Sequence, residues 1–338
     1  MKILVVASNM VHIKNFHLPY IKKFTENGND VYVMTFHDGA DFNIPFKKKA
    51  FSFKNFRLSF KIRKILKKEC FDAVFVHTTL AAFWTRIAIK GLKKKPIVVN
   101  TVHGYLFSKN SSFLKRKIYL FAEKIVRKCT DYIFVMNEED REIAEKHRLC
   151  KKEVISIDGM GVKLDSFDKA KEVKDNSNRL NLVYVGEISK RKNQIFLVKA
   201  LKFLENAHLT LVGDGSERKN IEKYAWQNGV FDRLEITGFT KNVKDYLAKA
   251  DIYVSASVIE GLPFNIIEAM AMKLPIVASD IKGQRDLLSN EHLYSLNNME
   301  EFVSLIKNTP KCSTSYDIEK YKLENVLDKN VGLYLDIN

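Results

Sequence analysis

The sequence has no long hydrophobic run and no clustered cysteines. None of its 338 residues lies in a stretch approaching the roughly 18 consecutive apolar residues that a membrane-spanning helix needs. The apolar start, residues 1–8, is too short for a signal peptide and predicts an opening strand. The four cysteines are scattered without a Cys-x-x-Cys pair, which argues against a zinc site or a disulfide framework and favours a reducing cytosol.

Positive charge is distributed unevenly along the chain, whose net charge is +16. Residues 1–178 contain 35 Lys+Arg and 19 Asp+Glu, whereas residues 179–338 contain 21 of each. The excess in the first half predicts a polyanionic partner, which is nucleic acid, an anionic bilayer or a phosphorylated substrate. The alternative is an unevenly charged surface without a specific partner.

Short apolar runs alternate with helical patterns along the whole chain. Runs of this kind, rich in Val and Ile, predict parallel sheets covered by helices on both faces. A polar segment, residues 165–178, has little to bury and predicts a linker between two α/β halves. The expected strands are residues 3–7, 31–36, 73–76, 97–102, 132–136 and 154–157 in the first half, and 182–185, 209–212, 234–237, 252–256 and 276–278 in the second.

Glu260 and Glu268 enclose a Gly-x-Pro turn, with seven residues between them. An apolar run precedes Glu260, and a helical pattern holds Glu268 in its early turns. The positive end of that helix suits a diphosphate, and a carboxylate beside it suits sugar hydroxyl groups. The alternative is a turn flanked by two solvated carboxylates.

This layout resembles the Glu-x7-Glu signature of the retaining glycosyltransferases of family 4, of the kind that builds bacterial capsules, lipopolysaccharide and lipid-linked oligosaccharides. The resemblance covers nearly the whole chain and is strongest in residues 182–290. It implies the α/β GT-B fold, in which two doubly wound Rossmann-like domains face each other across a cleft. By it, residues 1–164 form the acceptor domain, 165–178 the linker and 179–315 the donor domain, and 316–338 form a helix that crosses back.

The donor side is expected around the glycine and the basic loop that end the first strand of the second half. In the family's Gly-Arg-Leu-x-x-x-Lys-Gly loop, Lys192 matches the lysine, whereas Glu187 stands at the arginine position. Either Lys190 or Arg191 then supplies the missing cation, or the donor site is weaker. The residues expected to bind the nucleotide sugar are Gly186, Lys190, Arg191, Lys192, Phe239, Thr240, Glu260, Gly261, Leu262, Pro263, Phe264, Asn265, Ile266 and Glu268.

The sequence contains no Asp-x-Asp dyad placed to hold a metal ion between diphosphate oxygens. In GT-B enzymes, cationic side chains and helix-end amides neutralise the leaving diphosphate instead. We therefore expect no required metal ion and no cofactor besides the nucleotide sugar, which is expected to be UDP-linked. His103, Lys192 and Glu260 are the expected catalytic residues.

Polar residues follow two strands of the first half, at the edge where doubly wound sheets bind ligands. Asn9, His12, Asn15 and His17 follow the first strand and are expected to bind the acceptor through sugar hydroxyls or phosphate. This stretch resembles the opening of bacterial polysaccharide and lipid-linked-oligosaccharide transferases, without the glycine-rich loop of many family members. His103, before Gly104, matches a family histidine near the transferred sugar. The alternative for each histidine is a structural role.

Two basic and apolar segments, residues 57–68 and 113–121, have the composition of helices that dock on anionic lipid. Ordinary core-facing helices are the alternative. Together with the charge asymmetry, these segments predict a protein attached to the cytoplasmic face of the plasma membrane.

The resemblance implies a hexosyltransferase that moves a sugar, with retention, from a nucleotide sugar to a lipid-linked or soluble saccharide in cell-surface polysaccharide assembly. The expected lipid is a polyprenyl diphosphate. A nucleotide-sugar epimerase and an inactive sugar-binding relative on the same fold are the alternatives. A nucleic-acid-binding protein is less consistent with the chain, because no RNA- or DNA-reading motif is present.

Overall fold

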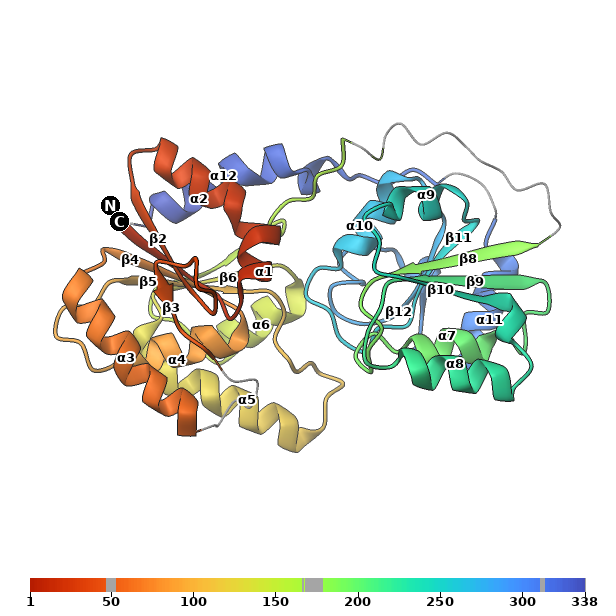
Figure 1. Cartoon of the computed structure of the whole chain (residues 1–338), viewed down its shortest axis with the longest axis horizontal. Helices are drawn as coiled ribbons and strands as arrows, with labels where there is room; N and C mark the ends of the chain where they lie inside the picture. The colour runs from red at the N-terminus through yellow and green to blue at the C-terminus, as the bar shows by residue number, and fades with distance from the viewer. Residues whose placement is uncertain (47–52, 166, 168–178, 311–313, 338) are drawn as a thin grey trace. The chain divides into compact units, whose positions relative to one another are not determined.

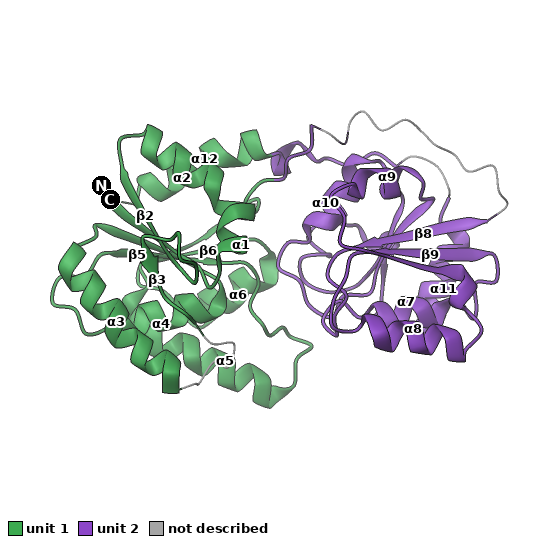
Figure 2. Cartoon of the chain, in the orientation of Figure 1, with its two compact units in different colours: residues 1–161, 323–338 green, residues 162–322 purple. Residues whose placement is uncertain are grey.

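The chain forms two compact units, in a computed structural model that describes residues 1–46, 53–165, 167, 179–310 and 314–337 (Figure 1). Unit 1 contains Met1–Gly161 and Leu323–Asn338, and unit 2 contains Val162–Lys322 (Figure 2). Most of the expected linker, residues 168–178, lies outside the described residues. The C-terminal helix α12 (Leu323–Leu335) groups with unit 1 and begins seven residues later than residue 316.

Unit 1 is built on a parallel sheet of seven strands in the order β3-β2-β1-β4-β5-β6-β7. Helices α3, α4 and α5 cover one face, and α2 and α12 cover the other (Figure 1). The strands are β1 (Lys2–Val6), β2 (Asp30–Thr35), β3 (Phe42–Asn43), β4 (Ala73–His77), β5 (Ile97–Val102), β6 (Tyr132–Val135) and β7 (Glu153–Ser156). The helices are α1 (Met10–His12), α2 (Leu18–Glu26), α3 (Phe53–Glu69), α4 (Thr79–Ile89), α5 (Phe113–Val126) and α6 (Glu138–Lys146), besides α12.

Strand β4 shows why these strands read as continuous apolar runs, since all five of its residues are buried. Successive side chains of a strand point to opposite faces of the sheet. Val74 and Val76 pack in the cluster that contains Ile62 of α3. Phe75, between them, packs against Tyr334 of α12, with ring centroids 4.6 Å apart. Both faces are therefore core, and an alternating apolar and polar pattern would not fit.

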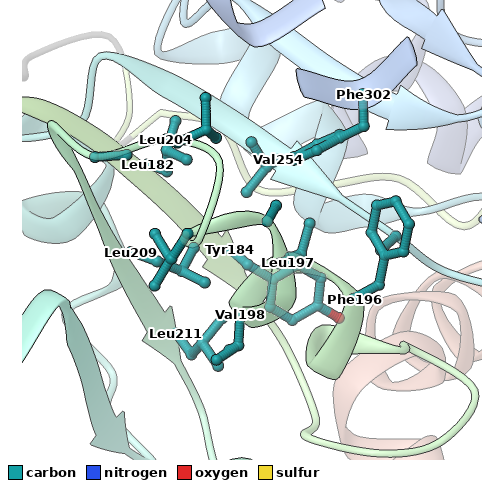
Figure 3. Packing of buried hydrophobic residues seen from close by; sticks show 14 of the residues in the cluster. Leu182, Tyr184, Phe196, Leu197, Val198, Leu204, Leu209, Leu211, Val254 and Phe302 are labelled. Carbon is teal, nitrogen blue, oxygen red and sulfur yellow. The ribbon is translucent and has the colours of Figure 1, made fainter. Parts of the chain in front are cut away.

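Unit 2 repeats this architecture with six strands in the order β10-β9-β8-β11-β12-β13. Figure 3 shows Tyr184 and Leu211 on the strands packing with Phe196 and Leu197 of α7 on one face of the sheet. The strands are β8 (Leu180–Val185), β9 (Ala207–Val212), β10 (Leu234–Gly238), β11 (Ile252–Ser255), β12 (Ile276–Ser279) and β13 (Leu293–Tyr294). The helices are α7 (Gln194–Ala200), α8 (Arg218–Gln227), α9 (Val243–Ala248), α10 (Phe264–Ala271) and α11 (Met299–Asn308).

The prediction of two doubly wound α/β halves is confirmed, and the eleven expected strands are present with ends shifted by at most two residues. The sequence analysis missed β3 and β13, each of two residues, because so short a run carries no periodic signal. Among the described residues, no helix combines the length and the apolar character that crossing a bilayer requires.

Candidate active site

Each sheet has one point where the strand order reverses direction, and the candidate site residues gather there. The reversal lies between β1 and β4 in unit 1 and between β8 and β11 in unit 2. Ligands of doubly wound sheets bind beyond the carboxyl ends of the strands at this point. Four histidines of unit 1 lie in the segments that follow β1 and β5 and at the last residue of β4, and the loops that leave β8 and β11 carry Arg191, Lys192 and Glu260.

Glu260 lies at the centre of a charged cluster in unit 2. Lys192 Nζ donates to Glu260 Oε1 at 2.5 Å, and Arg191 Nη1 donates to Glu260 Oε2 at 3.0 Å. Lys192 is only 9% exposed and Glu260 only 7%. Burial by itself raises the pKa of Glu260, but the charges of Lys192 and Arg191 outweigh it and hold the pKa below its ordinary value. The cluster is therefore a carboxylate with two cations.

The sequence-based prediction places Lys190, Arg191 and Lys192 near a diphosphate and Glu260 near a sugar, and the structure adds that Arg191 and Lys192 also contact Glu260. Here both cations use Glu260 as their partner, since a buried carboxylate is stable only when opposite charges compensate it. The main chain joins the two loops as well, because the Val258 N–H donates to the Arg191 carbonyl at 2.9 Å. No local pattern in the sequence predicts this pairing.

Buried polar side chains behind the cluster fix the loop that carries Glu260. Ser279 Oγ donates to the Ser257 carbonyl at 2.7 Å, and Gln284 Nε2 donates to Ser255 Oγ at 2.6 Å. Gly283 lets its own loop approach closely, because a Cβ there would lie 2.3 Å from the Gly261 carbonyl oxygen. Sequence reasoning missed these supporting residues, since serine and glutamine carry no motif of their own.

Glu268 lies in α10. Burial raises the pKa of its carboxyl group to about 7, and no neighbouring charge contributes to this shift. It is thus poised between its neutral and charged forms near neutral pH. Asn265, one turn earlier, donates from Nδ2 to the Val185 carbonyl at 2.7 Å and so fastens α10 to the end of β8. Asn265 was expected to bind the donor, and in the structure this contact occupies its amide.

The other expected donor residues fall into two groups. Gly186 takes φ +142° at the end of β8, while Lys190 and Phe239 are exposed. Glu187, which stands at the arginine position of the family's loop, is exposed as well. Thr240 accepts the Asn242 N–H at 3.1 Å. The members that form or pack the turn before α10 are Gly261, Leu262, Pro263, Phe264 and Ile266, of which Leu262 and Phe264 join the cluster around Ile267.

Four histidines cluster at the corresponding point of unit 1. The rings of His12 and His17 have centroids 5.0 Å apart, and those of His12 and His103 are 4.7 Å apart. His77, at the end of β4, lies 3.9 Å from the His17 ring and shares a 3.3 Å contact between its Nδ1 and His103 Nε2. The sequence analysis named three of these residues and missed His77, although its place beside a predicted strand end was a usable signal.

A π-helical turn, Ile13–His17, sets the geometry of this histidine cluster. Residues five apart point in different directions in an α-helix, whereas the wider π-turn returns them to one side. His12 and His17 can therefore meet. Asn9 caps α1 by accepting the His12 N–H at 2.9 Å, and Asn15 is exposed, so the structure does not add these two side chains to the cluster.

Burial lowers the pKa of His12 to about 4. It also holds the pKa of His17, His77 and His103 well below the usual value, with added repulsion from neighbouring imidazoles. Each ring is thus neutral at pH 7 and offers one donor and one acceptor. Nitrogen atoms of His12, His17 and His103 lie within 4.8 Å of one another. Among the described residues, these three histidines are the group whose spacing could hold a metal ion.

Known glycosyltransferases resemble this chain over most of its length. The model of the family described as Glycosyltransferase Family 4 matches residues 20–162, and that described as Glycosyl transferases group 1 matches residues 165–321. The chain is 27% identical to the putative glycosyltransferase EpsD of Bacillus subtilis, over 85% of this chain and 81% of that protein.

It is also 29% identical to an Escherichia coli protein named UDP-Gal:alpha-D-GlcNAc-diphosphoundecaprenol alpha-1,3-galactosyltransferase, over 84% of this chain and 80% of that one. Among solved structures, the apo form of the lipopolysaccharide outer core galactosyltransferase WaaB matches with a TM-score of 0.74 at 19% identity, covering 99% of each chain. The chain therefore belongs to the glycosyltransferases of the GT-B fold, with a family 4 half followed by a group 1 half.

Proposed function

We propose that the protein transfers a hexose from a UDP-linked sugar to a saccharide on a polyprenyl diphosphate, with retention, during assembly of a capsule or lipopolysaccharide. The observation that carries this proposal is the cluster that the buried Glu260 and Lys192 form with the more exposed Arg191 at the reversal point of unit 2. The printed name of the E. coli relative supplies the class of donor and acceptor.

In the proposed reaction, the bond between the anomeric carbon and the diphosphate lengthens first and negative charge grows on the diphosphate. Lys192 and Arg191 stabilise that charge, and Lys192 acts strongly because it is shielded from water. Glu260 orients both cations. From the same position it accepts a hydrogen bond from a hydroxyl group of the transferred sugar. Glu268 accepts hydrogen bonds from the ribose hydroxyls in its charged form.

Among the described residues near Glu260 no side chain is placed as a covalent nucleophile. Retention therefore relies on attack from the face that the diphosphate leaves, with a phosphate oxygen taking the acceptor's proton. The neutral histidines of unit 1 accept and donate hydrogen bonds to acceptor hydroxyls or phosphate oxygens. The cations at Glu260 make a metal ion unnecessary at the donor diphosphate.

A donor panel tests the proposal. The protein is incubated with UDP-glucose, UDP-galactose and their N-acetyl forms, with and without undecaprenyl diphosphate-linked GlcNAc, and UDP release is measured. We expect one donor to release UDP faster with the acceptor, and the product to keep the donor's anomeric configuration by NMR. An epimerised sugar without UDP would identify an epimerase, and binding without either product would identify a sugar-binding relative.

EDTA provides a second test of the same site. We expect donor turnover to be unchanged by EDTA, because Lys192 and Arg191 provide the positive charge that a metal would otherwise supply. Inhibition by EDTA that added Mg²⁺ or Mn²⁺ reverses would contradict a metal-free donor site.

A further inference from the structure

Unit 1 contains an apolar cavity besides its histidine cluster. It lies between α4, α5 and the loop after β5, and its volume is about 480 Å³. Cavities that bury a drug-sized ligand have about 300–1,000 Å³. Its lining includes Tyr105, Phe107, Leu114, Tyr119, Ala122 and Glu123.

The one carboxylate of this lining is neutralised inside the protein. Glu123 accepts two hydrogen bonds from the Arg86 guanidinium, at 2.9 and 3.0 Å, and both residues are buried. Aromatic rings form much of the remaining wall, with Phe107 stacked on Tyr105 and on Tyr119 at 5.3 and 6.0 Å between centroids. The cavity therefore presents hydrocarbon to an occupant.

The mouth of the cavity combines exposed apolar side chains with cations. Phe113 is 71% exposed and Leu114 is 67% exposed, at the beginning of α5. Lys115, Arg116 and Lys117 follow directly in the sequence, and Lys115 lines the cavity. Isolated apolar side chains on a surface are ordinary, but a group of them beside a cavity marks a binding site.

The loop that forms one wall also carries a member of the histidine cluster. His103 follows β5, and Tyr105 and Leu106 lie two and three residues further along. A ligand of unit 1 that reaches both features must have a polar head and an apolar chain.

We propose that this cavity binds the first isoprene units of a polyprenyl diphosphate acceptor. This inference deepens the proposed function and rests on it for the identity of the head group. The apolar lining takes the chain, the cations at the mouth attract the diphosphate, and the chain beyond the cavity remains in the bilayer, beside Phe113 and Leu114.

Binding of short isoprenoids to the full-length protein tests the inference. Calorimetric titrations use inorganic diphosphate, geranyl diphosphate and farnesyl diphosphate below their aggregation concentrations. We expect affinity to rise about tenfold for each isoprene unit buried, a gain consistent with the efficiency of drug-sized ligands. Equal affinity for the three compounds would overturn the proposal.

Two variants on α5 locate the binding. Ala122→Trp fills the cavity, so farnesyl diphosphate should lose at least about tenfold in affinity while inorganic diphosphate is unaffected. Phe121→Trp is the matched control, because Phe121 is exposed on the same helix and is not part of the lining. Equal loss in both variants would contradict the assignment.

A third variant guards against misfolding at position 122. Leu114 lines the mouth but is exposed, so Leu114→Gln should keep the fold and reduce affinity for farnesyl diphosphate several-fold. Unchanged affinity in a folded Leu114→Gln protein, together with unchanged affinity in Ala122→Trp, would overturn the proposal.

Two other occupants are distinguished by further measurements. Competition by lysophosphatidic acid as strong as that by farnesyl diphosphate would assign the cavity to acyl chains and overturn the isoprenoid assignment. If light scattering detects a dimer that the Leu114→Gln variant does not form, the cavity would be assigned to a second copy of the chain. UDP release from UDP-sugars is measured separately. If binding depends on isoprenoid chain length but no UDP is released, the proposed function is rejected and the assignment of the cavity stands.

Discussion

A carboxylate and two cations in unit 2 decide the chemistry at the scale of single residues. Glu260, Lys192 and Arg191 compensate one another, and their loops are joined through the Val258 N–H. In the proposed reaction, such a cluster holds its cations in place before a diphosphate arrives, which reduces the cost of reorganisation. Lys190 lies next to the cluster in sequence but is exposed, so neighbouring lysines have different roles.

This difference gives the first prediction. We expect Lys192→Ala to lower donor turnover by about 10²–10³, because it removes a buried charge that stabilises the leaving diphosphate. The measurement is UDP release at saturating donor, with thermal melting to confirm folding. Lys190→Ala is the control and should change turnover only slightly. Comparable losses in both variants would contradict the special position of Lys192.

Glu268 gives a prediction for pH. Its pKa is raised to about 7, so the ionised form, which we propose accepts hydrogen bonds from two ribose hydroxyls, increases as pH rises through 7. We expect affinity for UDP-glucose to increase about tenfold between pH 6 and pH 8. The diphosphate of a nucleotide sugar does not titrate in this range, which makes it a better probe than UDP.

The control for this titration is Glu268→Gln, which cannot ionise. We expect weaker binding in this variant and no dependence on pH over the same range. A Glu268→Gln protein that binds UDP-glucose like the parent protein would show that Glu268 does not contact the donor.

Single elements of the fold bring distant residues together in unit 1. The π-helical turn Ile13–His17 places His12 and His17 on the same side, and the parallel pairing of β4 with β5 adds His77 and His103. Helices α4 and α5 are joined in a different way, since the buried Arg86 on α4 binds Glu123 on α5 through two hydrogen bonds. Buried pairs of this kind fix how two helices meet.

The α4–α5 pair gives a prediction for stability. Arg86→Met leaves Glu123 buried without its partner, and we expect the free energy of unfolding to fall by about 3–5 kcal/mol. The measurement is urea denaturation. Arg86→Met combined with Glu123→Leu removes both charges and should recover most of the loss. A double variant no more stable than Arg86→Met would contradict the assignment of the loss to the unpaired charge of Glu123.

Charge is divided between the two units of the whole molecule much as it is between the two halves of the sequence. Unit 1 has 32 Lys+Arg against 18 Asp+Glu, a net +14, and unit 2 has 24 against 22, a net +2. On α3, Ile62 and Leu66 are buried in the core, whereas Phe53, Phe56 and Phe60 are exposed together with lysines. The helix therefore has an apolar stripe in the core and further aromatic rings on the surface.

We expect unit 1 to attach the protein to anionic membranes. Replacing Lys61, Lys64, Lys67 and Lys68 by Gln should lower co-sedimentation with vesicles containing phosphatidylglycerol, since each cation near the surface contributes roughly 1 kcal/mol. Salt should weaken binding of the parent protein. The matched control replaces four exposed lysines of unit 2: Lys219, Lys223, Lys241 and Lys249. Equal loss in both sets would indicate a net-charge effect, and no binding at low salt would reject membrane attachment.

The sequence by itself determined the architecture and the order of the site loops. Val- and Ile-rich runs predicted the long strands, because strands buried on both faces must be apolar throughout. The Glu-x7-Glu spacing and the glycine at the end of β8 predicted the loops that carry Glu260 and Lys192, because both patterns are local in the chain. The two-residue strands β3 and β13 could not be predicted in this way, because only hydrogen bonding to a neighbouring strand defines them.

Only the tertiary structure decided which side chains meet. The contact of Lys192 with Glu260 joins residues 68 positions apart, and the contact of His77 with His103 joins residues 26 positions apart. Asn265, which was expected at the donor, also fastens α10 to the end of β8 by donating to the Val185 carbonyl. The depressed pKa values of the histidines, the raised pKa of Glu268 and the apolar cavity all depend on burial, which arises only when the helices pack on the sheets.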